Sequence, residues 1–179
     1  MTVQVVAPDP SWPTSFSVEA QRIRDALGDN VSNLHHIGST AITGIFAKPI
    51  IDMLLVVHNL QLLDAKSTNL ALLGYEVMGE FGIPGRRYFR RSSSEGIRTH
   101  HVHAFQCGSS HVERHLAFRD YMNAHPQLAQ LYSSLKRSLA EAHPNAMDAY
   151  IEGKDAFIKE HELNAVSWKN RTTSACMTV

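Results

Sequence analysis

The sequence predicts an α/β (α+β) fold, with a mixed β-sheet, helices packed on it and a helical C-terminal half. Three observations predict this class. Residues 1–107 alternate between extended and helical patterns, and residues 110–164 have helical spacing throughout. The apolar run at 49–57 is rich in β-branched residues and nearly continuous, which is typical of a central strand that is buried on both faces.

The first half supplies two helices and all the strands. Helical spacing of apolar residues predicts helices at 15–27 and 60–73, each followed by a glycine that can end it, Gly28 or Gly74. An extended segment with three prolines precedes the first helix. The expected strands are 34–37, 49–57, 75–81, 86–92 and 99–107.

The second half is expected to contain three helices. Ser109 or Ser110 can cap the first, and Pro126 can begin the second, which should run to about residue 143. The third should cover 146–164. Their apolar residues are expected to form a core, which comprises Phe118, Tyr121, Leu128, Leu131, Tyr132, Leu135, Leu139, Phe157 and Ile158.

We expect these elements to form one domain over residues 1–179. The mixed α/β part would cover 1–109, the helical part 110–164 and a tail 165–179. The length suits one sizeable core, and 44% hydrophobic with 19% charged residues is typical of a globular protein.

Charge and composition argue against several classes of protein. Seventeen basic residues balance seventeen acidic ones, so bulk charge gives no reason to expect nucleic acid as a partner. No apolar run is long enough to cross a membrane, and the N-terminus does not have the pattern of a signal peptide. We therefore expect a cytoplasmic protein without a membrane partner. The two cysteines have no metal-type spacing, and the oligomeric state is open.

A glycine–serine turn and a lone aspartate stand out in "HIGSTAITGIFAKPIIDMLLVV", residues 36–57. Gly38, Ser39 and Thr40 could offer amides and hydroxyls to a phosphate, or could form an ordinary turn. Asp52 lies in an apolar strand, where a carboxylate needs a partner or a cation. Lys48 could be an ion-pair partner of Asp52 or a phosphate contact.

The strand at 99–107 carries a histidine pair. His101 and His103 should point to one face, because side chains alternate along a strand. Such a pair can hold a divalent metal, although one H-x-H motif is also common without a ligand. Beside an aspartate on a neighbouring strand, the metal interpretation gains support.

These segments together resemble the GrpB family, which belongs to the nucleotidyltransferase superfamily. After residues 36–57 the resemblance continues, in order, through "LGYE", "RRYF", "HHVHAF", "LAFRDYMNAHP", "YSSLK" and "AYIEGKDAFI", nearly to the end of the chain. It implies a nucleotidyltransferase-like fold. In the superfamily, a glycine–serine turn grips the phosphates of a nucleotide, and three acids on two strands hold two divalent cations.

The resemblance places Gly38 and Ser39 at the turn and Asp52 at the first acid. Leu54 stands where the second acid would be, and the strand with His101 and His103 has no acid. We therefore expect Asp52, His101 and His103 to be the catalytic or metal-binding residues, with one divalent metal, Mg²⁺, Mn²⁺ or Zn²⁺. This donor set suits Mn²⁺ or Zn²⁺ better than paired Mg²⁺.

Cationic residues are expected to complete a phosphate site. Arginine and lysine bind phosphate well, and several of them lie in the segments that carry the resemblance. The expected phosphate- or nucleotide-binding residues are Gly38, Ser39, Thr40, Lys48, Arg86, Arg119, Lys136, Tyr150 and Lys154.

Three functions remain open at this point. The chain could be a metal-dependent nucleotidyl or phosphoryl transferase that takes a nucleotide or a phosphorylated small molecule. It could be a catalytically inactive module that binds such a ligand after loss of the second and third acids. It could also serve as a structural partner of another enzyme.

Overall fold

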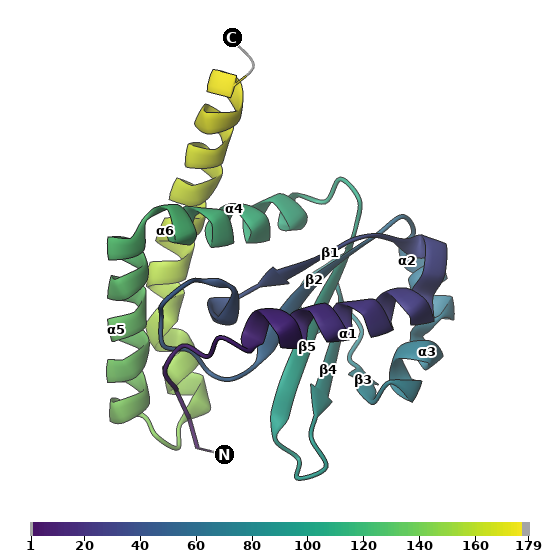
Figure 1. The fold of residues 1–179 in the computed structure, drawn as a ribbon, viewed down its shortest axis with the longest axis horizontal. Helices are drawn as coiled ribbons and strands as arrows, with labels where there is room; N and C mark the ends of the chain where they lie inside the picture. Colours follow the sequence, from purple (N-terminus) through teal and green to yellow (C-terminus); the bar gives the residue numbers. More distant parts are fainter. Residues whose placement is uncertain (1, 177–179) are drawn as a thin grey trace. The chain divides into compact units, whose positions relative to one another are not determined.

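The computed structural model describes residues 2–176 (Figure 1) and contains two compact units. The first, here called the sheet unit, consists of Asp9–Ala41 and Ile50–Val112. The second, the helical unit, consists of the described part of Met1–Pro8, Ile42–Pro49 and Glu113–Val179. The helical unit thus includes two segments from the first half of the chain, besides the expected helices. That the units form one domain stays a prediction.

The sheet unit is built on a five-stranded mixed sheet in the order β1-β2-β5-β4-β3. Strands β2 and β5 are parallel neighbours, and the other neighbouring pairs are antiparallel. The strands are β1 (Val31–Ile37), β2 (Ile51–Val57), β3 (Tyr75–Val77), β4 (Arg87–Ser92) and β5 (Arg98–Gln106). The expected mixed sheet and the buried central strand β2 are confirmed, since every β2 residue except Asp52 is buried.

Helix α1 (Trp12–Leu27) contacts β1 and β2 on one side of this sheet and also contacts the short helix α3 (Ser67–Leu72) (Figure 1). Its Glu19 is 2% exposed and accepts hydrogen bonds from Tyr75 at 2.9 Å and from Arg91 at 2.7 Å. Because a buried carboxylate is stable only when it is paired, these bonds fix α1 against β3 and β4.

The helix expected at 60–73 is divided in two, α2 (Leu60–Ala65) and α3. Lys66 lies at the break, where its Nζ donates to the carbonyl of Leu27 at 2.7 Å. Asn69 makes a similar bond to the carbonyl of Ala26 at 2.8 Å. Both bonds attach this segment to the end of α1, a tertiary constraint that the local helical pattern does not contain.

Two further boundaries differ most from expectation, besides α1 and β1, which each begin three residues earlier than expected. The strand expected at 75–81 ends at Val77, and a loop of residues 78–86 follows it. The last helix, α6 (Met147–Cys176), continues well beyond the expected end at 164 and includes most of the expected tail. Short 3-10 turns cover Gly28–Asn30 and Ser39–Ala41.

The helical unit contains α4 (Ser110–Ala124) from Glu113 on, α5 (Pro126–Ala142) and α6. An antiparallel bridge between Val6 and Ala47 joins its two early segments. The core consists of Ile42, Ile45, Met122, Ala129 and Tyr132, with Phe118, Leu128, Phe157 and Ile158 packed against it.

The assignment of Leu131 to the core is wrong, because its side chain is 63% exposed. The neighbouring Tyr132 is buried, and a helix turns by about 100° per residue, which directs Leu131 away from that core. Among residues 2–176, no helix is both long enough and apolar enough to span a membrane.

Candidate functional site

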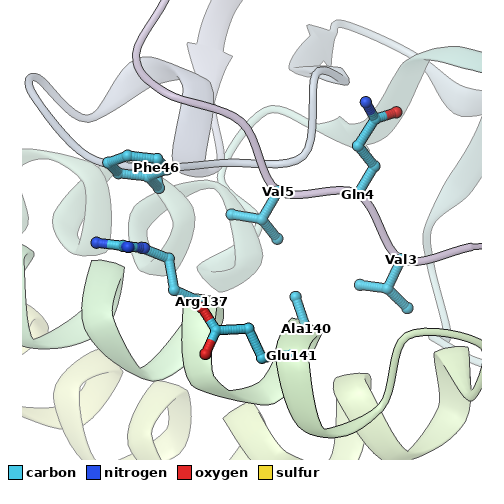
Figure 2. A pocket seen from close by; sticks show the side chains of 7 residues that line it. All are labelled: Val3, Gln4, Val5, Phe46, Arg137, Ala140 and Glu141. Carbon is cyan, nitrogen blue, oxygen red and sulfur yellow. The ribbon is translucent and has the colours of Figure 1, made fainter.

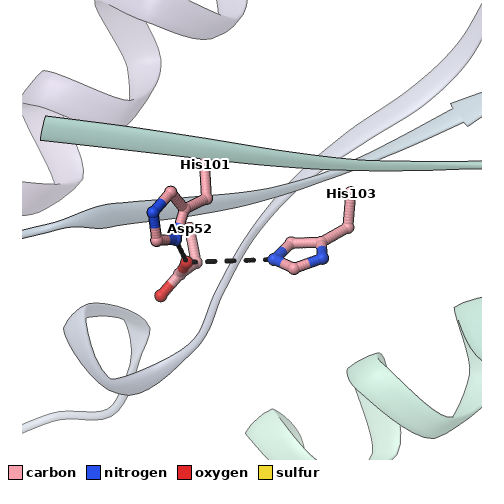
Figure 3. A group of neighbouring side chains, drawn as sticks. All are labelled: Asp52, His101 and His103. Atoms are coloured by element: carbon pink, nitrogen blue, oxygen red, sulfur yellow. Dashed lines mark hydrogen bonds and ion pairs between the residues drawn. The ribbon is translucent and has the colours of Figure 1, made fainter. Parts of the chain in front are cut away.

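The parallel register of β2 and β5 brings Asp52, His101 and His103 together (Figure 3). Asp52 is the partner of His101 across the two strands, and Leu54 is the partner of His103. Nδ1 of His101 lies 3.0 Å from Oδ1 of Asp52, and Nε2 of His103 lies 3.9 Å from the same oxygen. One ligand atom from each residue lies within 4.8 Å of the others.

Gly38 explains the spacing between the turn and the aspartate. Residue 37 pairs with Asp52, so the turn begins directly beside the carboxylate. Gly38 has a φ of +70°, and a Cβ at this position would lie 2.8 Å from Cβ and 2.9 Å from Cγ of Asp52, and against Oδ2. A glycine is therefore needed both for the backbone conformation and for the close approach.

The environment of Asp52 favours its ionised form. Burial alone would raise the pKa of this carboxyl group, but hydrogen bonding from His101 and His103 outweighs that effect and holds the pKa well below its ordinary value. Its side chain is 26% exposed. The site therefore presents a carboxylate that still reaches solvent, flanked by two imidazoles.

The turn after Gly38 contains one engaged hydroxyl and one available hydroxyl. The Thr40 hydroxyl lies 2.9 Å from Nε2 of His36 and donates to the carbonyl of Ile50 at 3.2 Å. Thr40 is 6% exposed, so this side chain supports the turn. Within the described part of the chain, the Ser39 hydroxyl makes no hydrogen bond to another residue.

Arg86 lies next to the site but is committed to protein groups. Its Nη2 donates to the carbonyl of Phe81 at 2.6 Å, and its Nε donates to the carbonyl of Glu80 at 3.1 Å. Nη1 lies 3.4 Å from Nδ1 of His103. Since a guanidinium group can only donate, this contact favours the His103 tautomer whose Nδ1 is unprotonated and whose Nε2–H faces Asp52.

Two aromatic residues beside the site were not expected from the sequence. The ring of Tyr88 lies 5.6 Å from His101 and 5.2 Å from His103, and the ring of Phe81 stacks on Tyr88 at 5.3 Å. Tyr88 could have been found, because it is two residues from Arg86 and therefore on the same face of the strand. Phe81 could not, because its position depends on the conformation of a loop.

In the helical unit, the expected residues Lys48, Lys136, Tyr150 and Lys154 lie close together. The Nζ atoms of Lys48 and Lys154 lie 5.7 and 4.3 Å from the centre of the Tyr150 ring. Lys136 donates to the carbonyl of Phe46, and its Nζ lies 4.5 Å from the ring of Tyr132. These contacts are of the cation–π type.

Lys136 and Tyr150 are each 1% exposed, and burial changes the acidity of both. Burial, with a smaller effect of the Lys154 charge, lowers the pKa of Lys136 to about 7. Burial also raises the pKa of Tyr150 above its ordinary value. The burial of Lys136 could not be predicted from the sequence around it, because it results from the packing of α5 against the 42–49 segment.

Arg119 has a carboxylate partner within the helical unit. Its Nε and Nη2 donate to Oδ1 of Asp120 at 2.9 and 2.7 Å, and Lys169 donates to the other oxygen at 3.0 Å. The bond between Lys169 and Asp120 connects α6 to α4. A phosphate-binding role of Arg119, and a common pocket of the helical residues with Asp52, stay predictions.

The helical unit also contains an open cavity of about 380 Å³ (Figure 2). The expected site residues are absent from its lining, which consists of Val3, Gln4, Val5, Phe46, Arg137, Ala140 and Glu141. The guanidinium of Arg137 lies 4.6 Å from the centre of the Phe46 ring. The cavity is therefore separate from the residues that the sequence singled out.

Comparison with known proteins decides the family. The model of the family described as GrpB protein matches residues 2–163. The chain belongs to the GrpB family. It is 42% identical over 173 residues to the UPF0157 protein YqkA of Bacillus subtilis, an alignment that covers 97% of this chain and 50% of the relative. The chain therefore spans about half the length of that protein.

Solved structures support the same assignment. The GrpB protein of Enterococcus faecalis has a TM-score of 0.88 and 42% identity, over 93% of this chain and 99% of that chain. A structure of the Cid1 poly(U) polymerase with MgGTP bound has a TM-score of 0.51 and 12% identity, over 76% of this chain and 44% of that one. At this identity the likeness shows the fold alone, and it confirms a nucleotidyltransferase-like fold for the GrpB-family chain.

The three clustered side chains of this GrpB-family chain fit one divalent ion. Ligand bonds of about 2.0–2.2 Å allow two ligands of one ion to be at most about 4.4 Å apart, so the 4.8 Å spread requires only small side-chain shifts. One carboxylate with two imidazoles suits Zn²⁺ or Mn²⁺ better than Mg²⁺. Ligation through Nε2 would require His103 to carry its proton on Nδ1 and to give up the contact with Arg86.

Proposed function

We propose that this GrpB-family protein binds a phosphorylated small molecule of the nucleotide class through one divalent metal ion held by Asp52, His101 and His103. The observation that carries this proposal is the convergence of an ionised carboxylate and two imidazoles beside the Gly38 turn. A bound divalent ion supplies positive charge for phosphate oxygens, which an aspartate alone would repel.

The turn provides the second element of the proposal. Ser39 follows Gly38 directly, and its hydroxyl can donate to a phosphate oxygen without losing a bond to another described residue. Thr40 holds the turn in place through its bonds to His36 and Ile50. The turn and the cluster belong to the same unit, so their geometry does not depend on the helical unit.

Nucleotide chemistry is favoured by the fold. Cid1, whose fold is similar, is described with MgGTP bound, and a nucleotidyltransferase-like sheet carries its metal ligands at the position of Asp52 according to the resemblance. The expected phosphate-binding roles of Lys48, Lys136 and Lys154 stay predictions.

Transfer of a phosphoryl or nucleotidyl group is the second candidate function. It is favoured by the 3.0 Å contact of His101 with Asp52, since a carboxylate that accepts a hydrogen bond from Nδ1–H leaves Nε2 able to accept a proton from an attacking hydroxyl. The presence of Leu54 in place of the second acid argues for the binding function over two-metal transfer.

Paired ligands provide the test. We expect ATP and AMP to bind in calorimetric titrations with Mn²⁺, adenosine to bind much more weakly, and a chelator to remove the difference. Asp52→Asn should abolish the metal-dependent part, whereas Glu95→Gln, which removes an exposed carboxylate in the same unit, should not. Equal binding of ATP and adenosine by the folded protein with Mn²⁺ would refute the proposal.

A further inference from the structure

The loop of residues 78–86 holds an exposed aromatic ring in an unfavourable backbone conformation. Phe81 has a φ of +46° and is the only non-glycine residue with positive φ in the described chain, 2–176. Its side chain is 56% exposed. A bulky residue rarely adopts this conformation, and an exposed phenyl ring gains little from burial, so folding alone gives no reason for this placement.

Hydrogen bonds within the loop and from the Arg86 side chain keep Phe81 in this conformation. The Arg86 side chain, 7% exposed, donates to the carbonyls of Glu80 and Phe81. The Glu80 side chain in turn accepts from the amide of Gly85 at 2.7 Å. These bonds hold the loop backbone in one conformation, so the aromatic ring is already positioned before a ligand binds.

The Phe81 ring is connected to the metal-binding cluster through Tyr88. Ring centres of Phe81 and Tyr88 are 5.3 Å apart at an interplanar angle of 26°, which is a stacked pair. The next step, from Tyr88 to His103, is 5.2 Å. Because Tyr88 covers one side of the phenyl ring, the exposed surface of Phe81 is the part that a ligand could reach.

The loop contains three glycines beside Phe81. Gly79, Gly82 and Gly85 have no side chain, and a Cβ atom added at any of them would meet no atom within 4 Å outside its chain neighbours. The phenyl ring is itself 56% exposed, which leaves surface for a planar ligand.

We infer that Phe81 is a stacking platform for the base of a nucleotide whose phosphates reach the Asp52–His101–His103 cluster. This inference rests on the proposed function and names its ligand class. Stacking on an aromatic side chain accepts any base because every base has a π face. The Phe81 and Tyr88 ring centres are 5.3 Å apart, and those of Tyr88 and His103 are 5.2 Å apart. A ribose and its phosphates can cover the separation between Phe81 and His103. Phe81 would thus distinguish nucleotides from other phosphates.

The test compares ATP with inorganic tripolyphosphate in calorimetric titrations with Mn²⁺. Wild-type protein should bind ATP about 5- to 150-fold more tightly than tripolyphosphate, the range expected for one stacked base. Phe81→Gly should bring the two affinities close together while tripolyphosphate affinity stays unchanged. Glycine suits the positive φ, so this variant is expected to fold. Phe81→Trp should keep the preference, and its indole fluorescence should be quenched by ATP.

The outcomes separate this inference from the proposed function. Tight tripolyphosphate binding without any advantage for ATP, or an ATP advantage that survives in Phe81→Gly, would overturn the stacking role and leave the metal–phosphate site standing. Absence of tripolyphosphate binding by the wild-type protein with Mn²⁺ would contradict the metal–phosphate site, and the stacking role with it.

Discussion

Replacement of Gly38 by alanine tests the close packing of the turn against Asp52. Position 38 has a φ of +70°, and the added Cβ would lie 2.8 and 2.9 Å from Cβ and Cγ of Asp52. The left-handed conformation costs an L-residue about 1–2 kcal/mol, and overpacking against a fixed side chain costs about 1–3 kcal/mol more. We expect Gly38→Ala to lower the free energy of unfolding by about 2–5 kcal/mol.

Gly96→Ala is the matched control for this prediction. Gly96 lies in the same unit with a φ of +77°, but a Cβ there would meet no atom within 4 Å. It should therefore lose only the backbone contribution, about 1–2 kcal/mol. Urea unfolding followed by circular dichroism measures both losses. Equal losses in the two variants, together with equal Mn²⁺ affinities, would refute the packing of Gly38 against Asp52.

Three other substitutions follow from the same geometry. Lys136→Met removes a buried lysine whose pKa of about 7 lies below its ordinary value of 10.5. Between pH 7 and 10.5 the folded wild-type chain has therefore lost the Lys136 proton, whereas the unfolded chain still holds it. Relative to the variant, the wild-type free energy of unfolding should rise in that window by up to about 1.4 kcal/mol per pH unit. Urea unfolding at pH 7–10 checks this, with the exposed Lys159→Met as control. Parallel pH profiles of wild type and Lys136→Met would contradict it. Arg86→Gln should raise Mn²⁺ affinity roughly tenfold, because the glutamine carbonyl oxygen can accept a hydrogen bond from Nδ1–H of His103 and the substitution removes a nearby charge. Unchanged affinity by calorimetry would show that the contact does not matter. Leu54→Asp should raise Mn²⁺ affinity above that of Leu54→Asn, because residue 54 shares a strand face with the aspartate two positions before it; no difference between these folded variants would mean that position 54 does not reach the site.

The arrangement of the site within the sheet could be predicted from sequence. Alternation along a strand places His101 and His103 on one face, and the apolar run around Asp52 indicates a central strand. Their parallel pairing then brings the carboxylate to the histidines. Alternation and the apolar pattern are local, which is why they can be applied without coordinates, whereas the parallel pairing of the two strands comes from the structure.

The contacts of Arg86 could not be predicted in this way. Its guanidinium is 7% exposed and bonded to two loop carbonyls and to His103, and its expected binding of phosphate stays a prediction. The conformation of the loop depends on these bonds, so no repeating pattern in the sequence contains it. The membership of residues 2–8 and 42–49 in the helical unit could not be predicted either, because it depends on the bridge between Val6 and Ala47.

The end of α6 shows a different limit. The helical pattern becomes weak after residue 164, yet the helix continues to Cys176. Lys169 of this part donates to Asp120 on α4 at 3.0 Å, and Trp168 packs edge-on against Tyr121 at 5.7 Å. Contacts with another helix, which are invisible in a local window, support this extension.

The central claim is that Asp52, His101 and His103 hold one divalent ion, and a Mn²⁺ titration tests it most directly. Electron paramagnetic resonance detects free Mn²⁺ and so gives the number of ions bound per chain. We expect one site in the wild-type protein and in Glu95→Gln, and an affinity at least about tenfold lower in Asp52→Asn, because the carboxylate is the only anionic ligand of the cluster. Binding that is equal in Asp52→Asn and wild type, or absent from a folded wild-type protein, would contradict the account.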